Sequence, residues 1–124
     1  MRSLMLGVAL AAATVGGAAA QAPDPSSLVG LWCGGAIHHR DAGSIELAIA
    51  TVNDGVAFGT YTWRGSAPMQ MSLNGTLTGS GLKVTLEDGT VLELALKHDK
   101  LDGLLVNRDA GRRWDVSLAK RMAC

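Results

Sequence analysis

From position 28 onward, apolar residues alternate with polar or small ones in runs of roughly six to nine residues, separated by turns that contain glycine. A period of two is typical of β-strands that bury one face, and no helical period competes with it. The alternation therefore predicts eight short strands. They cover residues 28–36, 44–52, 56–63, 69–77, 82–87, 90–97, 101–107 and 113–120.

The connections between these strands predict antiparallel hairpins. The turns at 53–55 and 88–89 contain Asp-Gly pairs, which tolerate positive φ, and the turn at 78–81 is short and rich in glycine. Eight short strands in this order have two outer edges to hide, and closure removes both. We therefore expect an all-β fold, a small antiparallel up-and-down eight-stranded barrel, with a two-sheet β-sandwich as the alternative.

The same alternation assigns residues to the core in four strands. The residues expected to face inward are Ile45, Leu47, Ile49, Leu82, Val84, Leu86, Leu92, Leu94, Leu96, Trp114, Val116 and Leu118.

The third strand leaves two possibilities open. Val56 and Phe58 lie on one side, and Tyr61 and Trp63 lie on the other. If Tyr61 and Trp63 point outward, they form an aromatic pair of the kind that often serves binding. If they point inward, they close one end of the barrel.

The N-terminus is typical of an export signal. Arg2 precedes an apolar run that ends in small residues at 18–20, which predicts a signal peptide at 1–20. A flexible Pro-rich lead at 21–27 and a single barrel domain at 28–124 follow. We expect a periplasmic or secreted protein without a membrane span.

Charge gives no indication of a nucleic-acid partner. Loss of Arg2 with the signal peptide leaves ten basic residues against eleven acidic ones. The basic clusters Arg112-Arg113 and Lys120-Arg121 are small, whereas nucleic-acid binders gather a basic excess on one face.

The chain has two cysteines, Cys33 and Cys124. In an oxidising compartment they allow one intramolecular disulfide, which would close nearly the whole domain into a loop. An intermolecular bridge through Cys124 is the competing interpretation, and the absence of a Cys-x-x-Cys motif speaks against a redox role.

The stretch Gly30-Leu31-Trp32 resembles the Gly-x-Trp pattern in the first strand of lipocalins and of the wider calycin group of small eight-stranded barrels. The resemblance implies that Trp32 seals the barrel floor and that a basic residue near the last strand packs across it. Arg121 is the first candidate for that role and Arg113 the second.

The first half also resembles avidin-like proteins, where the matching positions of Ser44 and Tyr61 hydrogen-bond the ligand. Cys33-Gly34 stand where that family has a ligand-binding asparagine. The second half, with 81–89 and the ending Lys120-Arg121, is similar to periplasmic inhibitors of serralysin-type metalloproteases. That resemblance implies inhibition through the N-terminal lead.

Metal and catalytic chemistry are not indicated. His38, His39 and Asp41 are metal-ligand types, with His98 and Asp99 as distant partners, but adjacent histidines on a strand point to opposite faces. No nucleophile motif or poised carboxylate pair is present. We expect no metal, no cofactor and no catalytic residue.

The function expected from the sequence is therefore a non-enzymatic binding module of calycin type. Its expected ligand-binding residues are Tyr61, Trp63 and Ser44, and Trp32, Arg121 and Trp114 are expected to be structural. The partner is a small apolar ligand or a protein such as a protease. The alternatives are a periplasmic metalloprotease inhibitor and a structural envelope-associated domain.

Overall fold

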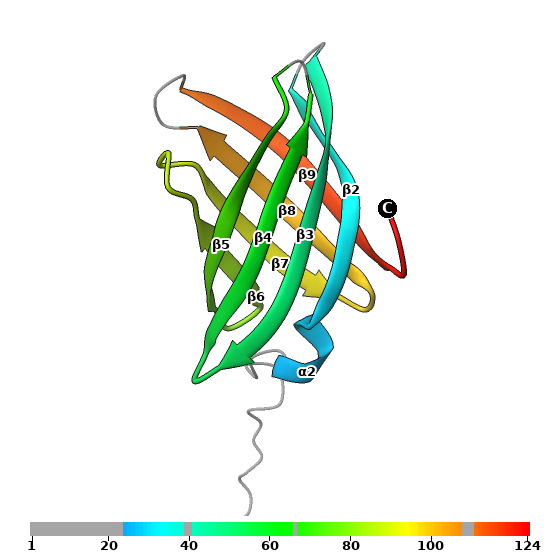
Figure 1. Ribbon diagram of the computed structural model, residues 1–124, viewed down its shortest axis with the longest axis vertical. Coiled ribbons are helices and arrows are strands. Elements are labelled where there is room, and N and C mark those ends of the chain that lie inside the picture. Colours follow the sequence, from blue (N-terminus) through cyan, green and yellow to red (C-terminus); the bar gives the residue numbers. More distant parts are fainter. Residues whose placement is uncertain (1–23, 39–40, 66, 108–110) are drawn as a thin grey trace, which may run out of the picture.

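The computed structural model describes residues 24–38, 41–65, 67–107 and 111–124, in which eight antiparallel strands close into one barrel (Figure 1). Each strand pairs with its neighbours in sequence, and β2 pairs with β9 to complete the ring. The predicted up-and-down barrel is confirmed, and the sandwich alternative is wrong. The elements are α2 (Pro25–Leu28), β2 (Gly30–His38), β3 (Asp41–Asn53), β4 (Val56–Arg64), β5 (Met69–Leu77), β6 (Gly81–Thr85), β7 (Val91–Lys97), β8 (Lys100–Asn107) and β9 (Arg112–Arg121).

The eight strands correspond one to one with those expected from the alternation, apart from the start of the first. Residues 25–28, expected as the end of a flexible lead and the first residue of a strand, form the one-turn helix α2. Asp24 caps this helix by accepting a hydrogen bond from Ser26 N at 3.0 Å, and Pro25 occupies the first helical position. A cap followed by proline starts a helix, and the strand then begins at Gly30. Residues 21–23 and the expected signal peptide lie outside the described residues.

The hairpin turns take the conformations that their residues favour. Asp54 and Gly55 have φ of 52° and 77°, and Gly89 has φ of 88°. These left-handed conformations are the ones that Asp-Gly pairs adopt in tight turns between antiparallel strands. The turn chemistry visible in the sequence therefore fixes these hairpins locally.

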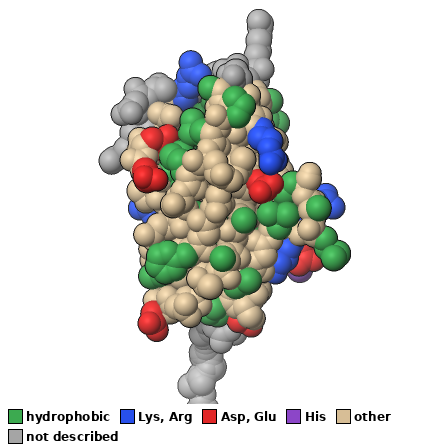
Figure 2. Space-filling view, in the orientation of Figure 1, with side chains coloured by type: hydrophobic (Ala, Val, Ile, Leu, Met, Phe, Trp, Pro, Cys, Tyr) green, Lys and Arg blue, Asp and Glu red, His purple; other side chains and the backbone are tan. Residues whose placement is uncertain are grey.

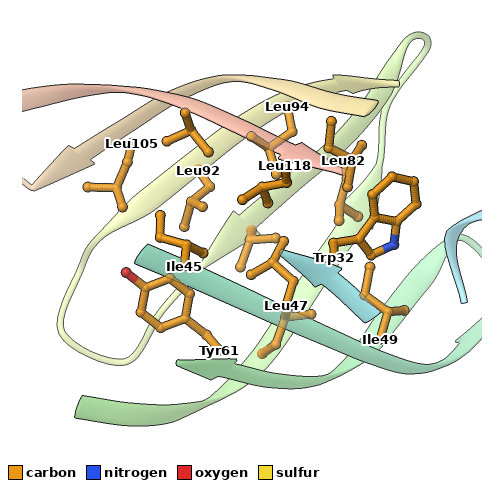
Figure 3. Packing of buried hydrophobic residues seen from close by; sticks show 14 of the residues in the cluster. Trp32, Ile45, Leu47, Ile49, Tyr61, Leu82, Leu92, Leu94, Leu105 and Leu118 are labelled. Carbon is orange, nitrogen blue, oxygen red and sulfur yellow. The ribbon is translucent and has the colours of Figure 1, made fainter. Parts of the chain in front are cut away.

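The inward faces of the strands form one continuous apolar core (Figure 3). Trp32, Leu47, Leu92 and Leu118 are at most 1% exposed. Every residue expected to face inward from the alternation is buried, except Leu96, which is half-buried and packs against the core. The barrel interior over most of its length is thus filled with side chains rather than hollow.

The small residues on the inward face of β4 do not leave a cavity in the barrel, because neighbouring atoms pack closely against them. A Cβ at Gly59 would overlap the backbone carbonyl oxygen of Ala48 on the neighbouring strand. Glycine here allows two strands of the tightly curved barrel to approach closely. Ala57, two residues earlier on the same face, is completely buried.

One end of the barrel is closed by α2, which lies beneath the start of β2 in Figure 1. Trp32 Nε1 donates a hydrogen bond to Leu28 O at 2.9 Å, and Lys120 Nζ donates one to Ser27 O at 2.8 Å. These two bonds satisfy carbonyl groups that the end of a helix leaves without an internal partner. We call this end the closed end.

The cation over Trp32 is Lys120, with Nζ 5.4 Å from the ring centroid, and not Arg121 or Arg113 as expected. The reason is the period of two in β9. Lys120 shares the inward parity of Trp114 and Leu118, whereas Arg121 and Arg113 are exposed.

The two cysteines form an intramolecular disulfide, as expected, with Cα atoms 5.8 Å apart. Cys33 lies on β2 and pairs with Ala119 of β9. Cys124 follows Ala119 by five residues, just beyond the end of β9. The bridge therefore ties the C-terminus to the first strand at the seam where the barrel closes. No helix in the described ranges has the length and apolar character that a membrane crossing requires.

Candidate ligand-binding site

A pocket of about 280 Å³ opens at the end of the barrel opposite α2. In an up-and-down barrel this end collects the β2–β3, β4–β5, β6–β7 and β8–β9 connections. We call the space the mouth pocket. Its described lining residues are Ala42, Tyr61, Trp63, Ala67, Met69, Met71, Asp88, Thr90, Leu105, Asn107, Arg112 and Trp114.

Two tryptophans from distant parts of the chain meet across this mouth. The rings of Trp63 on β4 and Trp114 on β9 lie edge to face, with centroids 5.3 Å apart and planes at 73°. This arrangement is a favoured geometry for aromatic pairs. Trp114 is 9% exposed, and Trp63 is half-buried. The pair forms an aromatic wall between the filled core and the opening.

Two glycines, Gly43 and Gly65, leave the space that the Trp63 ring occupies. A Cβ at Gly43 would overlap the far edge of the indole, and a Cβ at Gly65 would lie 2.6 Å from its Nε1. Because neither position carries a side chain, the Trp63 indole fits closely against the backbone of both glycines at the barrel mouth. Ile45 of β3 pairs with Trp63 of β4, and Gly43 lies two residues before Ile45 on the same face of β3.

Tyr61 lies deeper than Trp63 on the same face of β4 and is 3% exposed. In Figure 3 its hydroxyl oxygen lies at the end of the ring that faces away from Trp32 and the closed end. Burial raises the pKa of this phenol above its usual value, and the negative charge of Asp88 raises the pKa further. The hydroxyl is therefore neutral at physiological pH. No hydrogen-bond partner for it is found in the described part of the chain.

Asp88 reaches the pocket from the β6–β7 turn. Its Oδ1 accepts a hydrogen bond from Thr90 N at 2.9 Å, and Leu86 N donates to Thr90 O at 2.8 Å. Thr90 itself is 5% exposed. This local network fixes the aspartate at the rim, as is common for aspartate side chains that bond the backbone two residues later.

The structure places the three expected ligand-binding residues differently. Tyr61 and Trp63 both point inward and line the mouth pocket, so of the two possibilities for the third strand the inward one holds. Phe58 points outward and is 47% exposed. Ser44 is exposed on β3, because its inward neighbours there are Gly43 and Ile45, and it does not line the pocket.

Sequence reasoning assigned Trp114 to the core alone and missed Met69, Met71 and Asp88 as lining residues. A signal for them exists in the predicted topology. The end of each odd-numbered predicted strand and the start of the next lie at one end of an up-and-down barrel, whereas the end of each even-numbered strand and the start of the next lie at the other. Counting these ends places Trp63, Met69 and Trp114 at the same mouth.

The histidines do not come together. His98 lies in the β7–β8 turn near the closed end, whereas β2 ends at His38 beside the mouth. His39 lies outside the described residues. Among those that are described, no group of three or more His, Cys, Asp or Glu residues is close enough to hold a metal ion.

The basic pairs do not form patches either. On the face shown in Figure 2, the Lys and Arg side chains are scattered among uncharged ones. The two residues of each pair point to opposite faces of β9. Lys120 lies over Trp32 while Arg121 is exposed, and Arg112 lines the pocket while Arg113 does not.

Comparisons with protein-family models, with curated proteins and with solved structures found no match to this chain. The fold is a closed eight-stranded barrel, compatible with that of the calycins.

Proposed function

We propose that this chain is an exported, non-enzymatic binding module of calycin-like fold that holds a small apolar ligand in the mouth pocket. The observation that carries the proposal is the aromatic wall of Trp63 and Trp114 at the open end of a barrel that is otherwise filled. Ligand pockets are typically concave, mostly apolar and supplied with a few polar groups. The mouth pocket combines its aromatic wall, Met69, Met71 and Leu105 with the polar residues Asp88, Thr90, Asn107 and Arg112.

The pocket walls suit a ligand of variable outline. Met69 and Met71 come from β5 and line the pocket together with Trp114 of β9. Methionine side chains are flexible and polarizable, so they adapt to ligands that differ in shape. Met69 is 43% exposed and lies at the entrance.

Two further observations support export and a non-enzymatic role. The Cys33–Cys124 disulfide is of a kind that persists in oxidising compartments. None of the described residues that line the pocket is a serine, cysteine, histidine or lysine, and the one carboxylate among them, that of Asp88, accepts a hydrogen bond from Thr90 N.

The proposal is tested by titrating the protein, expressed without residues 1–20, with indole and naphthalene in a calorimeter. Binding in the unmodified protein is expected, with at least tenfold weaker binding in Trp63→Ala and in Trp114→Ala. Phe58→Ala removes an exposed aromatic ring from the outer face and serves as the matched control. Absence of binding to the unmodified protein, or equal losses in all three variants, would refute the proposal.

The inhibitor hypothesis depends on a free N-terminal lead. Lys120 bonds Ser27, and α2 packs at the closed end, so a segment that enters a protease cleft would have to precede residue 24. That segment lies outside the described residues, and inhibition stays a prediction. Purified protein that leaves a panel of secreted metalloproteases fully active would contradict it.

A further inference from the structure

We propose that the ligand of the mouth pocket is a neutral compound of one or two fused rings that carries a hydroxyl group, and that Tyr61 binds this hydroxyl at the inner end of the pocket. The inference rests on the proposed function and specifies its ligand.

The Tyr61 hydroxyl is the first observation. It belongs to a side chain that is 3% exposed and lines the mouth pocket, it points away from the closed end (Figure 3), and no donor or acceptor among the described residues pairs with it. Buried polar groups in folded proteins are almost always hydrogen-bonded, and each exception calls for an explanation. A ligand atom in the pocket supplies the missing partner.

The position of Asp88 indicates that this ligand atom both accepts and donates. Asp88 borders the same pocket, and its Oδ1 is already bonded to Thr90 N. The carboxylate lies close enough to Tyr61 to influence its phenol electrostatically. A ligand hydroxyl accepts a hydrogen bond from the Tyr61 O–H and donates one to the Asp88 carboxylate, whereas a ketone or an ether has no O–H to donate.

The charges around the pocket favour a neutral ligand. The charged side chains among its described lining residues are those of Asp88 and Arg112, whose formal charges cancel. A ligand carboxylate at the inner end would lie near Asp88, and a ligand ammonium would share the pocket with Arg112. Either charge would also lose its hydration beside the buried Tyr61 ring.

Size and shape limit the body of the ligand. The pocket holds about 280 Å³, and a dry cavity of about 150 Å³ is known to accept benzene. A body of one or two fused rings fits this space. The flat indole surfaces of Trp63 and Trp114 favour a planar ring system over a branched chain.

The test compares three probes of nearly identical outline by calorimetry: 2-naphthol, naphthalene and 2-naphthoate. In the unmodified protein we expect 2-naphthol to bind about tenfold more tightly than naphthalene, because it adds one or two hydrogen bonds. We expect 2-naphthoate to bind more weakly than 2-naphthol. Tyr61→Phe should lower the affinity for 2-naphthol to that for naphthalene and leave naphthalene binding unchanged. Ser44→Ala, on the outer face of β3, is the matched hydroxyl deletion and should change neither.

Each outcome separates the inference from the function on which it rests. Equal affinities for 2-naphthol and naphthalene in the unmodified protein overturn the hydroxyl inference and leave a binding pocket in place. Tightest binding of 2-naphthoate overturns it in favour of an anionic ligand. Failure of all three probes to bind counts against the proposed function itself. Because the comparison of probes uses the unmodified protein, it does not depend on how any variant folds.

Discussion

Lys120 lies directly opposite Trp32 in the β2–β9 register, and its ammonium nitrogen is 5.4 Å from the centroid of the indole ring. The two side chains hold α2 against the barrel through separate hydrogen bonds, Lys120 to Ser27 O and Trp32 to Leu28 O. Gly30 belongs to the same arrangement, because a Cβ there would lie 2.9 Å from Lys120 Cε. The Gly-x-Trp pattern therefore has a physical role here: glycine makes room for the cation that covers the tryptophan.

We expect Lys120→Met to destabilise the protein by about 1–2 kcal/mol, because the variant loses the cation–π contact and a charged hydrogen bond but keeps an apolar side chain over Trp32. The free energy of unfolding in urea measures the effect. Arg121→Met is the control, since this exposed neighbour should change stability by less than about 0.5 kcal/mol. Equal effects of the two substitutions would contradict the assignment of Lys120 to the closed end.

The disulfide should contribute substantially to stability. Cys33 and Cys124 are 91 residues apart, and the chain-entropy model gives about 4.7 kcal/mol for closing a loop of roughly 100 residues, an upper value. Reduction, or the double substitution of both cysteines by serine, should lower the midpoint of unfolding by an amount within that limit. The double variant should then show no further response to reductant. An unchanged midpoint after complete reduction would contradict the prediction.

Gly59→Ala should be severely destabilising, because its Cβ would overlap the carbonyl oxygen of Ala48 on the adjacent strand. Backbone does not move aside as a flexible side chain does, so we expect a loss of about 3 kcal/mol or more. Gly79→Ala provides the comparison, since a Cβ at that turn position meets nothing within 4 Å. Chemical denaturation of both variants measures the difference, and similar midpoints would show that the strand spacing relaxes.

Tyr61 makes stability depend on pH in the alkaline range. The pKa of its phenol is raised above the usual value of 10.0, chiefly by burial. Above about pH 10 the unfolded chain therefore loses this proton while the folded protein retains it. Fewer protons bound in the unfolded state means that stability falls as pH rises, by up to about 1.4 kcal/mol per pH unit from this group alone.

Two measurements check the alkaline prediction. Tyr61 is the single tyrosine of the chain, so tyrosinate absorbance reports on it alone, and the absorbance should rise only above pH 10 while the protein stays folded. Lysines titrate in the same range. The difference in unfolding free energy between the unmodified protein and Tyr61→Phe isolates the tyrosine contribution. A tyrosinate transition at pH 10 in the folded state would contradict it.

Most of the fold was predictable because the sequence is locally consistent. Alternation such as that of Leu82 and Val84 sets both strand type and face, and the Asp54-Gly55 pair sets a tight turn. The helix α2 was missed because the interpretation of 21–27 as a flexible Pro-rich lead overlooked the N-cap Asp24 and Pro25. A helix of four residues has no apolar period to detect.

The amino-acid sequence by itself determined the eight strands, their antiparallel order and the inward faces of four of them, because each follows from residues that are near in sequence. The intramolecular pairing of the two cysteines and the inward direction of Tyr61 and Trp63 were settled only by the tertiary structure. Tertiary structure decided which residues meet across the barrel. Four strands, β5 to β8, separate Trp63 from Trp114 in the sequence, and the two residues approach only because β9 closes on β2. The same closure set the β2–β9 register that puts Lys120 opposite Trp32, while the choice of Lys120 over Arg121 follows from the period of two in β9.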